Sequence, residues 1–273
     1  HVLYALGNLE NTNGLSLLGV VEIENKIVLA KLLADPLIRK HHYKFIHFDS
    51  KDARGVDVAL IYHPEKFTPY QYRPFSLSDD MYFKTYSTRD ILFVKGSLGN
   101  EWVYILVNHW PSRRGGEQSS RPKRLWAAKV CKRIMDSVNL EQPNAKWIVM
   151  GDFNDNPTDK SLQTLKLYNP FTQLFKKGIG TLAYNDSWSL FDQILLSQNW
   201  LGVSNNTTAA GDKFNTINCK PIIYKNEEMI EPIGRFQGYP KRTYNGNEFR
   251  GGYSDHFPVA LIFSLKNDKI DLK

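Results

Sequence analysis

The sequence predicts an α/β domain, with two mixed β-sheets packed face to face and helices on the outside. Short apolar runs bounded by Gly, Pro, Asn or Asp outnumber the helical segments, which favours a strand-rich fold. Gly99 and Asn100 lie between two such runs and indicate a tight antiparallel turn. Packed sheets with helices outside are the layered arrangement that buries these faces. The 273 residues suit one large domain, which we expect to span residues 1–273.

Two segments predict helices. Residues 25–33 end before the helix-breaking pair Asp35-Pro36. Residues 120–138 carry Pro122 in the first turn and apolar side chains at helical spacing. Residues 202–252 are polar and irregular, and we expect an insertion at the edge of the active site. The apolar runs that predict strands begin at Leu17, Val56, Asp90, Trp102, Trp147, Leu190 and His256.

The composition excludes several classes of protein. Hydrophobic residues at 42% and charged residues at 23% exclude a disordered tail, a collagen-like fibre and a coiled coil. No apolar run approaches the roughly 18–20 residues of a membrane span, so we expect no integral membrane contact. Two cysteines exclude a disulfide scaffold and leave no CxxC zinc motif.

The charge balance is basic. Lys and Arg number 35 against 28 Asp and Glu, which gives a net charge of +7 and a pI near 9.2. A basic protein favours an anionic partner, such as nucleic acid, a phosphate ester or a lipid headgroup surface. Basic charge also serves solubility alone, so this observation leaves the partner open.

The segment WIVMGDFND places Asp152 and Asn154 directly after a buried strand. Gly151 permits a tight backbone at this point. A carboxylate and an amide two positions apart can face one pocket, where they suit an activated water beside a phosphate oxygen. Asp and Asn are also common where a strand simply turns away from the sheet, so this segment alone supports both readings.

Two histidines also lie at strand ends. His109 ends the strand WVYILVNHW, and Asp255-His256 precedes another apolar run. A His beside a carboxylate can act as a metal ligand, a general base or a cation at a phosphate. The alternative is a polar turn that happens to contain these residues. Five basic residues follow His109 within 15 positions and favour an anionic substrate, namely Arg113, Arg114, Arg121, Lys123 and Arg124.

Four further charged residues stand out against apolar strands. Glu22 and Glu24 follow an apolar run, and either both belong to a site or one caps the next helix. Asp192 lies in the apolar segment SLFDQILLS, where a carboxylate needs a dedicated partner, most naturally a histidine. Arg89 begins a strand and could clamp a phosphate.

Seven segments follow one another along the chain in the order VVEIEN, RGVDVALIY, TRDILFVKG, LVNHWPSR, VMGDFND, SLFDQILLS and YSDHFPVAL. Together, in this order, they resemble the endonuclease/exonuclease/phosphatase superfamily, the metal-dependent phosphodiesterase fold of DNase I, exonuclease III, neutral sphingomyelinases and inositol polyphosphate phosphatases. RGVDVALIY, NHWPSR and GDFND look most like a bacterial branch of it. The resemblance implies a four-layer α/β sandwich with the active site where strand ends of both sheets meet.

The resemblance also implies a metal site. Glu22 would hold a divalent cation, usually Mg²⁺, with Mn²⁺ as an alternative, and Asp255 would complete the metal or water shell. Asp152 and Asn154 would position the nucleophilic water and the phosphate. Mg²⁺ keeps several waters and takes only one or two carboxylates from a protein, so a small ligand set is expected.

The same resemblance assigns the remaining groups. His256 would polarise the phosphate or transfer a proton, supported by Asp192. His109 would be the second histidine, and Arg89 and Arg113 would contact phosphate. These groups supply the charge relief and proton transfer that phosphodiester hydrolysis requires.

One part of the superfamily pattern does not match. Its first strand carries a site asparagine, and the string GNLEN at residues 7–11 does not fit, because only ten residues separate Asn11 from Glu22. We therefore expect the given chain to begin after that strand, with residues 1–6 as the end of a helix. Asp57 is a second uncertain position, either a partner of His109 or a structural carboxylate.

These observations together predict a divalent-metal-dependent hydrolase of phosphodiester bonds, a nuclease on DNA or RNA. One alternative is a phosphatase or phosphodiesterase acting on a small or lipid phosphate ester, such as an inositol phosphate or sphingomyelin. A non-catalytic binding module of the same fold is the other. We expect the protein to be a monomer whose partner is its substrate.

Overall fold

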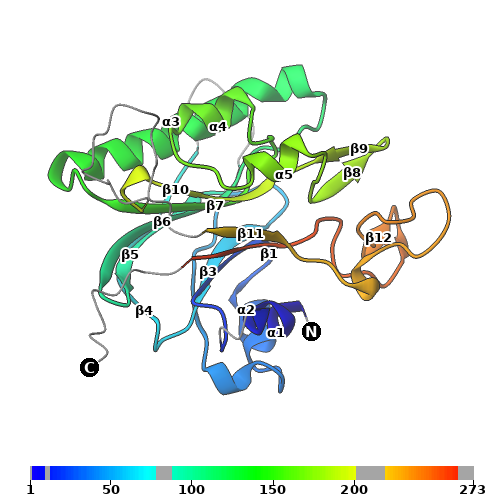
Figure 1. Ribbon diagram of the computed structural model, residues 1–273, viewed down its shortest axis with the longest axis horizontal. Coiled ribbons are helices and arrows are strands. Elements are labelled where there is room, and N and C mark those ends of the chain that lie inside the picture. The colour runs from blue at the N-terminus through cyan, green and yellow to red at the C-terminus, as the bar shows by residue number, and fades with distance from the viewer. Residues whose placement is uncertain (1, 10–12, 78–87, 201–218, 264–273) are drawn as a thin grey trace, which may run out of the picture.

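Two β-sheets stack on each other, with helices on both outer faces (Figure 1). The computed structural model describes residues 2–9, 13–77, 88–200 and 219–263. The predicted α/β class and its stacked sheets are confirmed. In the described part of the chain, no helix is long and apolar enough to cross a membrane.

The larger sheet has the strand order β10-β7-β6-β5-β4. Strands β6 and β7 are parallel and the other neighbours are antiparallel. Residues of β5, β6 and β7 are almost all buried, as expected for strands covered on both faces. The bounds are β4 Phe67–Phe75, β5 Ile91–Leu98, β6 Glu101–His109, β7 Lys146–Asp152 and β10 Asp192–Leu196.

The register of this sheet aligns three polar residues at one end. His109 of β6 lies opposite Asp152 of the parallel strand β7. Asp192 of the antiparallel strand β10 lies opposite the same Asp152. Residues opposite one another on neighbouring strands approach closely, so this register brings the three together.

The second layer of strands consists of a three-stranded sheet, ordered β1-β3-β2, and the pair β11-β14. The strands β2, β4 and β11 were not predicted. Strand β4 lies at an edge, is largely exposed and contains Pro69 and Pro74, which edge strands tolerate. The bounds are β1 Leu17–Ile23, β2 Lys44–His47, β3 Asp57–Tyr62, β11 Lys220–Ile223 and β14 Val259–Ile262.

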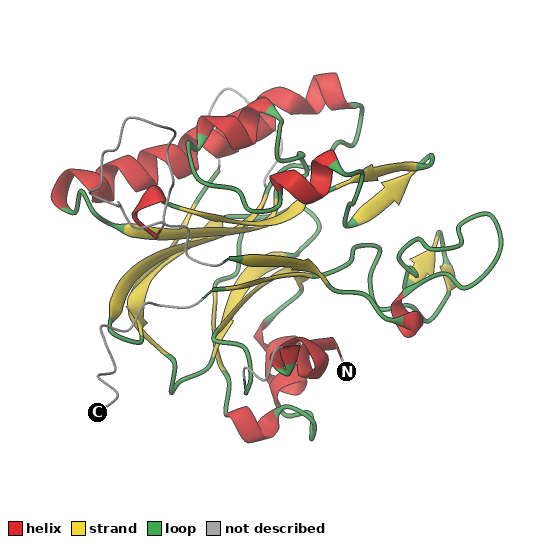
Figure 2. Cartoon of the chain, in the orientation of Figure 1, coloured by secondary structure: helices red, strands yellow, loops and turns green. Residues whose placement is uncertain are grey.

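Two small hairpins extend from the end of the sheets where β14 begins (Figures 1 and 2). Strands β8 and β9 form one hairpin, and β12 and β13 form the other. The irregular stretch predicted at residues 202–252 lies outside the described residues as far as residue 218, and beyond that it contains β11 and the second hairpin. The bounds are β8 Leu182–Tyr184, β9 Ser187–Ser189, β12 Tyr244–Asn245 and β13 Glu248–Phe249.

The long helix α3 (Glu117–Glu141) covers the larger sheet, and α1 (Val2–Gly7) and α2 (Lys26–Leu33) cover the other side (Figure 1). Asn25 caps α2 through its side-chain oxygen, so neither Glu22 nor Glu24 is the cap. Helix α3 is longer at both ends than predicted. The short helices are α4 Lys160–Thr164, α5 Thr172–Lys176, η2 Arg39–His41, η3 Gln198–Trp200 and η4 Glu227–Met229.

Three apolar clusters occupy the spaces between these layers. The largest lies between α3 and the larger sheet and includes Cys131 and Trp147. A second lies between the sheets and includes Leu60 and Ile105. The third lies between α2 and the smaller sheet around Leu29. Helix, sheet, sheet and helix thus form the four layers of the sandwich.

Gly151, one residue before Asp152, is required by the close approach of β6. Its φ is 138°, and a Cβ placed there would lie 1.9 Å from the carbonyl oxygen of Asn108. Gly178 also has a positive φ, of 74°, but a Cβ there meets no atom within 4 Å. Gly178 therefore gives the cost of a positive φ without a clash, whereas Gly151 combines a less accessible backbone angle with the clash.

We expect Gly151→Ala to lower the free energy of unfolding by more than about 3 kcal/mol, because strain and clash add. Gly178→Ala should cost only about 1–2 kcal/mol, the price of the backbone angle alone. Urea denaturation of both variants measures the difference. Equal losses would show that the approach of Asn108 is not what requires a glycine at position 151.

Candidate active site

The end of the larger sheet gathers side chains from four separate segments of the chain. Asp152, His109 and Asp192 come from three neighbouring strands, and His256 precedes β14 in the other layer. Ligand atoms of Asp152, Asp192 and His256 lie within 4.8 Å of one another. The predicted residues of both sheets thus meet at one place.

His256 is held by Asp192. Its Nδ1 lies 2.8 Å from an Asp192 carboxylate oxygen, which leaves the Nε2 on the opposite side of the ring. Burial alone would lower the pKa of His256, but the charge and hydrogen bond of Asp192 outweigh it and raise the pKa to about 10. His256 is therefore an imidazolium at neutral pH, and it can donate a proton.

His109 has the opposite character. Its Nε2 lies 3.5 Å from an Asp152 carboxylate oxygen, and its Nδ1 is buried with no hydrogen-bond partner in the described residues. Burial, with the positive charges of Arg89, Arg54 and His256, holds the pKa of His109 well below its usual value. The two imidazoles at this site thus differ in charge, one neutral and one cationic.

Among the residues of this group, Asp152 is the one whose negative charge is least stabilised by its surroundings. Burial and the nearby Asp192 carboxylate raise the pKa of Asp152 to about 7. Two carboxylates at close range favour either a proton or a cation between them. The carboxylate oxygens of this pair fit a divalent cation such as Mg²⁺ or Mn²⁺, which prefers oxygen ligands.

Asn154 lies over Asp152 in a left-handed conformation, with φ at 50°. Its backbone N–H donates to an Asp152 carboxylate oxygen at 2.8 Å, and its amide nitrogen donates to the Trp110 carbonyl at 3.0 Å. These bonds fix the amide group at the site, with its oxygen making no hydrogen bond within the described part of the chain. An amide oxygen of this kind can orient a water.

Glu22 interrupts the regular pairing of β1. The register with β3 shifts between Val21 and Ile23, and Glu22 has a φ of 59°. Such a bulge redirects a side chain at the end of a strand. Its carboxylate accepts a hydrogen bond from Arg54 at 3.2 Å and is half exposed. Glu24 is exposed and plays no part in these contacts.

Both arginines expected at the phosphate have protein partners instead. Arg89 is buried, and it donates to Asp52 at 3.3 Å and to the Trp110 carbonyl at 3.0 Å. Arg113 donates to Asp155 and Asp159. Arg89 therefore lies beneath the site, where its positive charge helps to lower the pKa of His109.

Two other expectations differ from the structure. Asp255 is half exposed with its carboxylate 3.8 Å from Arg242, and it lies outside the group formed by Asp152, Asp192 and His256. Asp57 is not a partner of His109. Its carboxylate binds His47 at 3.1 Å and the Ser50 backbone N–H at 2.8 Å.

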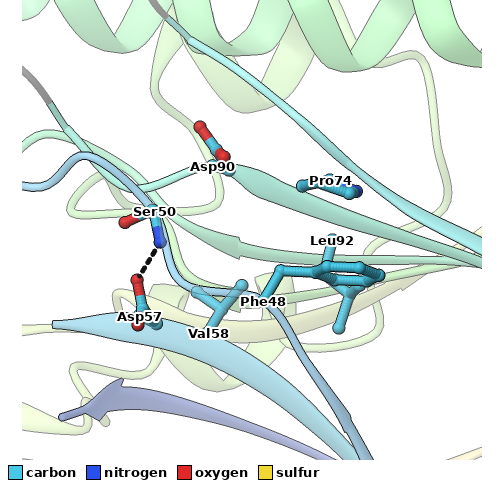
Figure 3. A pocket seen from close by; sticks show the side chains of 7 residues that line it. All are labelled: Phe48, Ser50, Asp57, Val58, Pro74, Asp90 and Leu92. Atoms are coloured by element: carbon cyan, nitrogen blue, oxygen red, sulfur yellow. Dashed lines mark hydrogen bonds between the residues drawn. The ribbon is translucent and has the colours of Figure 1, made fainter. Parts of the chain in front are cut away.

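Figure 3 shows the Asp57 side chain pointing at Ser50, beside a small pocket between β3 and β5. The pocket is lined mainly by apolar side chains, with Asp90 at its rim. Burial raises the pKa of Asp90. Asp57 is thus a structural carboxylate that fixes the turn after β2.

The sequence did not single out Arg54, Asp52 or the Trp110 carbonyl. Asp52 accepts from Arg89 and lies 3.8 Å from Arg54, so it joins both arginines to the site. The carbonyl of Trp110 accepts from both Arg89 and Asn154. The polar string DARG before a buried strand is a signal for Arg54 and Asp52, whereas a backbone acceptor leaves no trace in a sequence.

Solved structures share this fold. A mannosyl-6-phosphatase of Bacteroides thetaiotaomicron aligns at 16% identity with a TM-score of 0.57, over 96% of this chain and 91% of that chain. D. rerio TDP2 complexed with a single-strand DNA product aligns at 14% identity and a TM-score of 0.54, over 92% and 86%. The human Nocturnin catalytic domain with bound sulfate aligns at 17% identity and 0.51, over 71% and 73%. At these identities the likeness is one of fold.

No curated protein sequence matches the chain. The family model described as the Endonuclease/Exonuclease/phosphatase family matches residues 1–265, which includes every residue of the site described above. The chain belongs to the endonuclease/exonuclease/phosphatase family, whose members hydrolyse phosphoesters.

Proposed function

We propose that this protein is a divalent-metal-dependent hydrolase of phosphodiester bonds and that its substrate is a nucleic acid, DNA or RNA. One observation carries the proposal. A cationic His256, fixed by Asp192 at 2.8 Å, lies beside the buried carboxylate of Asp152 and faces the same site as the neutral His109. This pairing of an acid with a carboxylate base suits in-line attack by water on a phosphodiester.

Glu22 would hold the metal, since its carboxylate is accessible and lies on a bulge at the strand end. The carboxylates of Asp152 and Asp192 also favour a cation, and family members generally use divalent metals. When bound, Mg²⁺ or Mn²⁺ would neutralise charge on the phosphate oxygens. Asp255 would act on His256 through its charge, which helps to raise the pKa of that ring.

The protein groups divide the proton transfers among them. Asp152 would accept a proton from the attacking water, which the oxygen of Asn154 orients. His256 would donate a proton to the leaving oxygen, and Asp192 stabilises the cationic ring before that step. The Nε2–H of His109 would donate to a phosphate oxygen as charge develops there.

Nucleic acid is supported by the net charge of +7 and by the exposed Arg114 and Arg121 near the site-bearing loop. A second candidate is a sugar phosphate or another small phosphate ester. Asp155 forms ion pairs with two of the five basic residues after His109, Arg113 and Arg124. Because this leaves fewer positive charges for a polyanion, it favours a small substrate. The structural similarity to a mannosyl-6-phosphatase along nearly the whole chain points the same way.

A panel of substrates with Mg²⁺ tests the function. Single-stranded and duplex oligonucleotides, a small phosphodiester and sugar monophosphates should be compared at equal enzyme concentration, with and without EDTA. We expect oligonucleotide cleavage that EDTA abolishes. Turnover of sugar monophosphates without oligonucleotide cleavage would establish the second candidate. Activity that survives EDTA would rule out metal dependence.

We expect Asp152→Asn and His256→Asn each to lower kcat by about 10²–10⁴-fold, the usual contribution of a proton-transferring group. Asp136→Asn and His42→Asn are matched controls, because both side chains are exposed and distant from the site-bearing strand ends. Steady-state kinetics on the best substrate of the panel measure the effect. Losses as small as those of the controls would remove both residues from the mechanism.

The Asp192–His256 pair also predicts a pH dependence of stability. The pKa of His256 is raised from 6.5 to about 10 on folding, so the pair stabilises the fold fully below pH 6.5. That stabilisation is lost as the pH rises toward 10. In EDTA, the Tm of the wild type should therefore fall more between pH 7 and pH 10 than the Tm of Asp192→Asn. Parallel Tm curves for the two proteins would contradict the pairing.

A further inference from the structure

Arg113 lies on the loop after β6, in contact with the turn that carries Asn154. Its Nε donates to the Asn154 carbonyl oxygen at 2.9 Å. One terminal nitrogen lies 3.0 Å from Asp155 and 2.8 Å from Asp159, and the other lies 3.3 Å from Glu117. The guanidinium thus makes a backbone hydrogen bond and three ion pairs.

The flat face of the same guanidinium covers Phe191. Its central carbon lies 4.6 Å from the centre of the ring. Phe191 directly precedes Asp192, and its carbonyl accepts a hydrogen bond from the Phe153 backbone N–H at 2.9 Å. A single side chain therefore contacts the segments that carry Asn154 and Asp192.

This environment does not suit a phosphate. Three carboxylates already surround the guanidinium, and an approaching phosphate would meet their negative charge. Asp155 is itself fixed from the other side by the buried Arg124, whose Nε lies 2.7 Å away, and by the Ser161 hydroxyl at 2.5 Å. The charge of Arg113 is thus balanced by carboxylates of the protein itself, and its contacts join neighbouring segments of the chain.

The turn at Asn154 needs such support. A left-handed φ of 50° is strained for any residue with a side chain, although Asn tolerates it better than most. The Asn154 carbonyl belongs to the peptide unit that follows this residue, so the hydrogen bond from Arg113 restrains the backbone on the C-terminal side of Asn154. The N–H of Asn154 and its side-chain amide are held by Asp152 and by the Trp110 carbonyl, so Arg113 adds a side-chain hydrogen bond to the other end of the residue.

We infer that Arg113 is a positioning residue, which holds the Asn154 turn and the Phe191–Asp192 strand end in one fixed geometry for catalysis. The effect of Arg113 on catalysis rests on the proposed function, whereas its role in holding the turn does not depend on that function. Preorganised groups lose activity quickly when displaced, so an error of about 1 Å costs on the order of 100-fold in rate.

Arg113→Lys tests this, because lysine keeps the charge but lacks the planar fork that bonds and stacks at once. Arg133→Lys is the matched control, since Arg133 also stacks on a ring at 4.6 Å, that of Trp126, on the exposed side of α3. Asp159→Asn weakens one ion pair of Arg113 and leaves the Arg124–Asp155 pair intact. It also affects the Asn156 N–H, which donates to the same carboxylate at 2.8 Å, so for this variant kcat and KM are the deciding measurements. Two measurements are made on each: kcat and KM with a small phosphodiester, and hydrogen exchange of a peptide covering residues 151–156.

We expect Arg113→Lys to lower kcat by about 10- to 100-fold with KM within about twofold of the wild type. Exchange of the 151–156 peptide should become faster. Asp159→Asn should show the same pattern to a smaller degree, and Arg133→Lys should show neither change.

A raised KM with unchanged kcat and unchanged exchange would overturn the inference and restore Arg113 as a phosphate contact. No change in either measurement would overturn it as well. If the wild type hydrolyses no phosphoester, the proposed function fails, while the exchange result still decides whether Arg113 holds the turn.

Discussion

The register between β6, β7 and β10 is the constraint on which the site depends. Because β6 and β7 are parallel, His109 and Asp152 end their strands side by side. Because β10 is antiparallel to β7, it begins with Asp192 at the same level. A slip of one residue in either pairing would turn these side chains to the opposite face of the sheet. Gly151 secures the pairing, since any larger residue would push β7 away from Asn108.

This register concentrates negative charge in a buried place, and the surrounding residues respond to it. Asp192 is compensated by His256, which becomes a cation, whereas Asp152 faces a neutral His109. The uncompensated carboxylate of Asp152 is where a metal cation or a proton is most stabilised. The same charge distribution gives one histidine a proton to donate and leaves the other neutral, a division of roles that a symmetrical environment would not produce.

Four of the five basic residues after His109 divide into two groups. Arg113 and Arg124 turn inward to Asp155 and stabilise the loops beneath the site. Arg114 and Arg121 remain exposed. A net charge of +7 therefore overstates the positive charge available to a substrate in this segment. In this segment, only the exposed Arg114 and Arg121 distinguish a polymeric from a small phosphoester. A direct comparison of substrates is therefore more informative than the pI.

The sequence by itself determined the fold class, most strands of the two stacked layers and the strand-end position of the polar residues. Buried strands such as β5, β6 and β7 are continuous apolar runs, and polar residues at their ends stand out. Edge strands such as β4 were missed, because exposure and two prolines remove the apolar signal. A histidine partner for Asp192 was expected from chemistry, since a carboxylate in an apolar strand needs a partner, and the family resemblance pointed to His256.

Only the tertiary structure decided which charges meet. Arg89 and Arg113 were expected to bind phosphate, Asp57 was considered as a partner of His109, and Asp255 was expected among the metal ligands. Each of these depends on contacts between residues far apart in the chain, such as Arg89 with Asp52 and Asp57 with His47. A charged residue in a sequence shows that a partner is needed, but the partner is set by distances that sheet register and loop geometry create. That is why residue types were predictable here, whereas most of their pairings, apart from that of Asp192 with His256, were not.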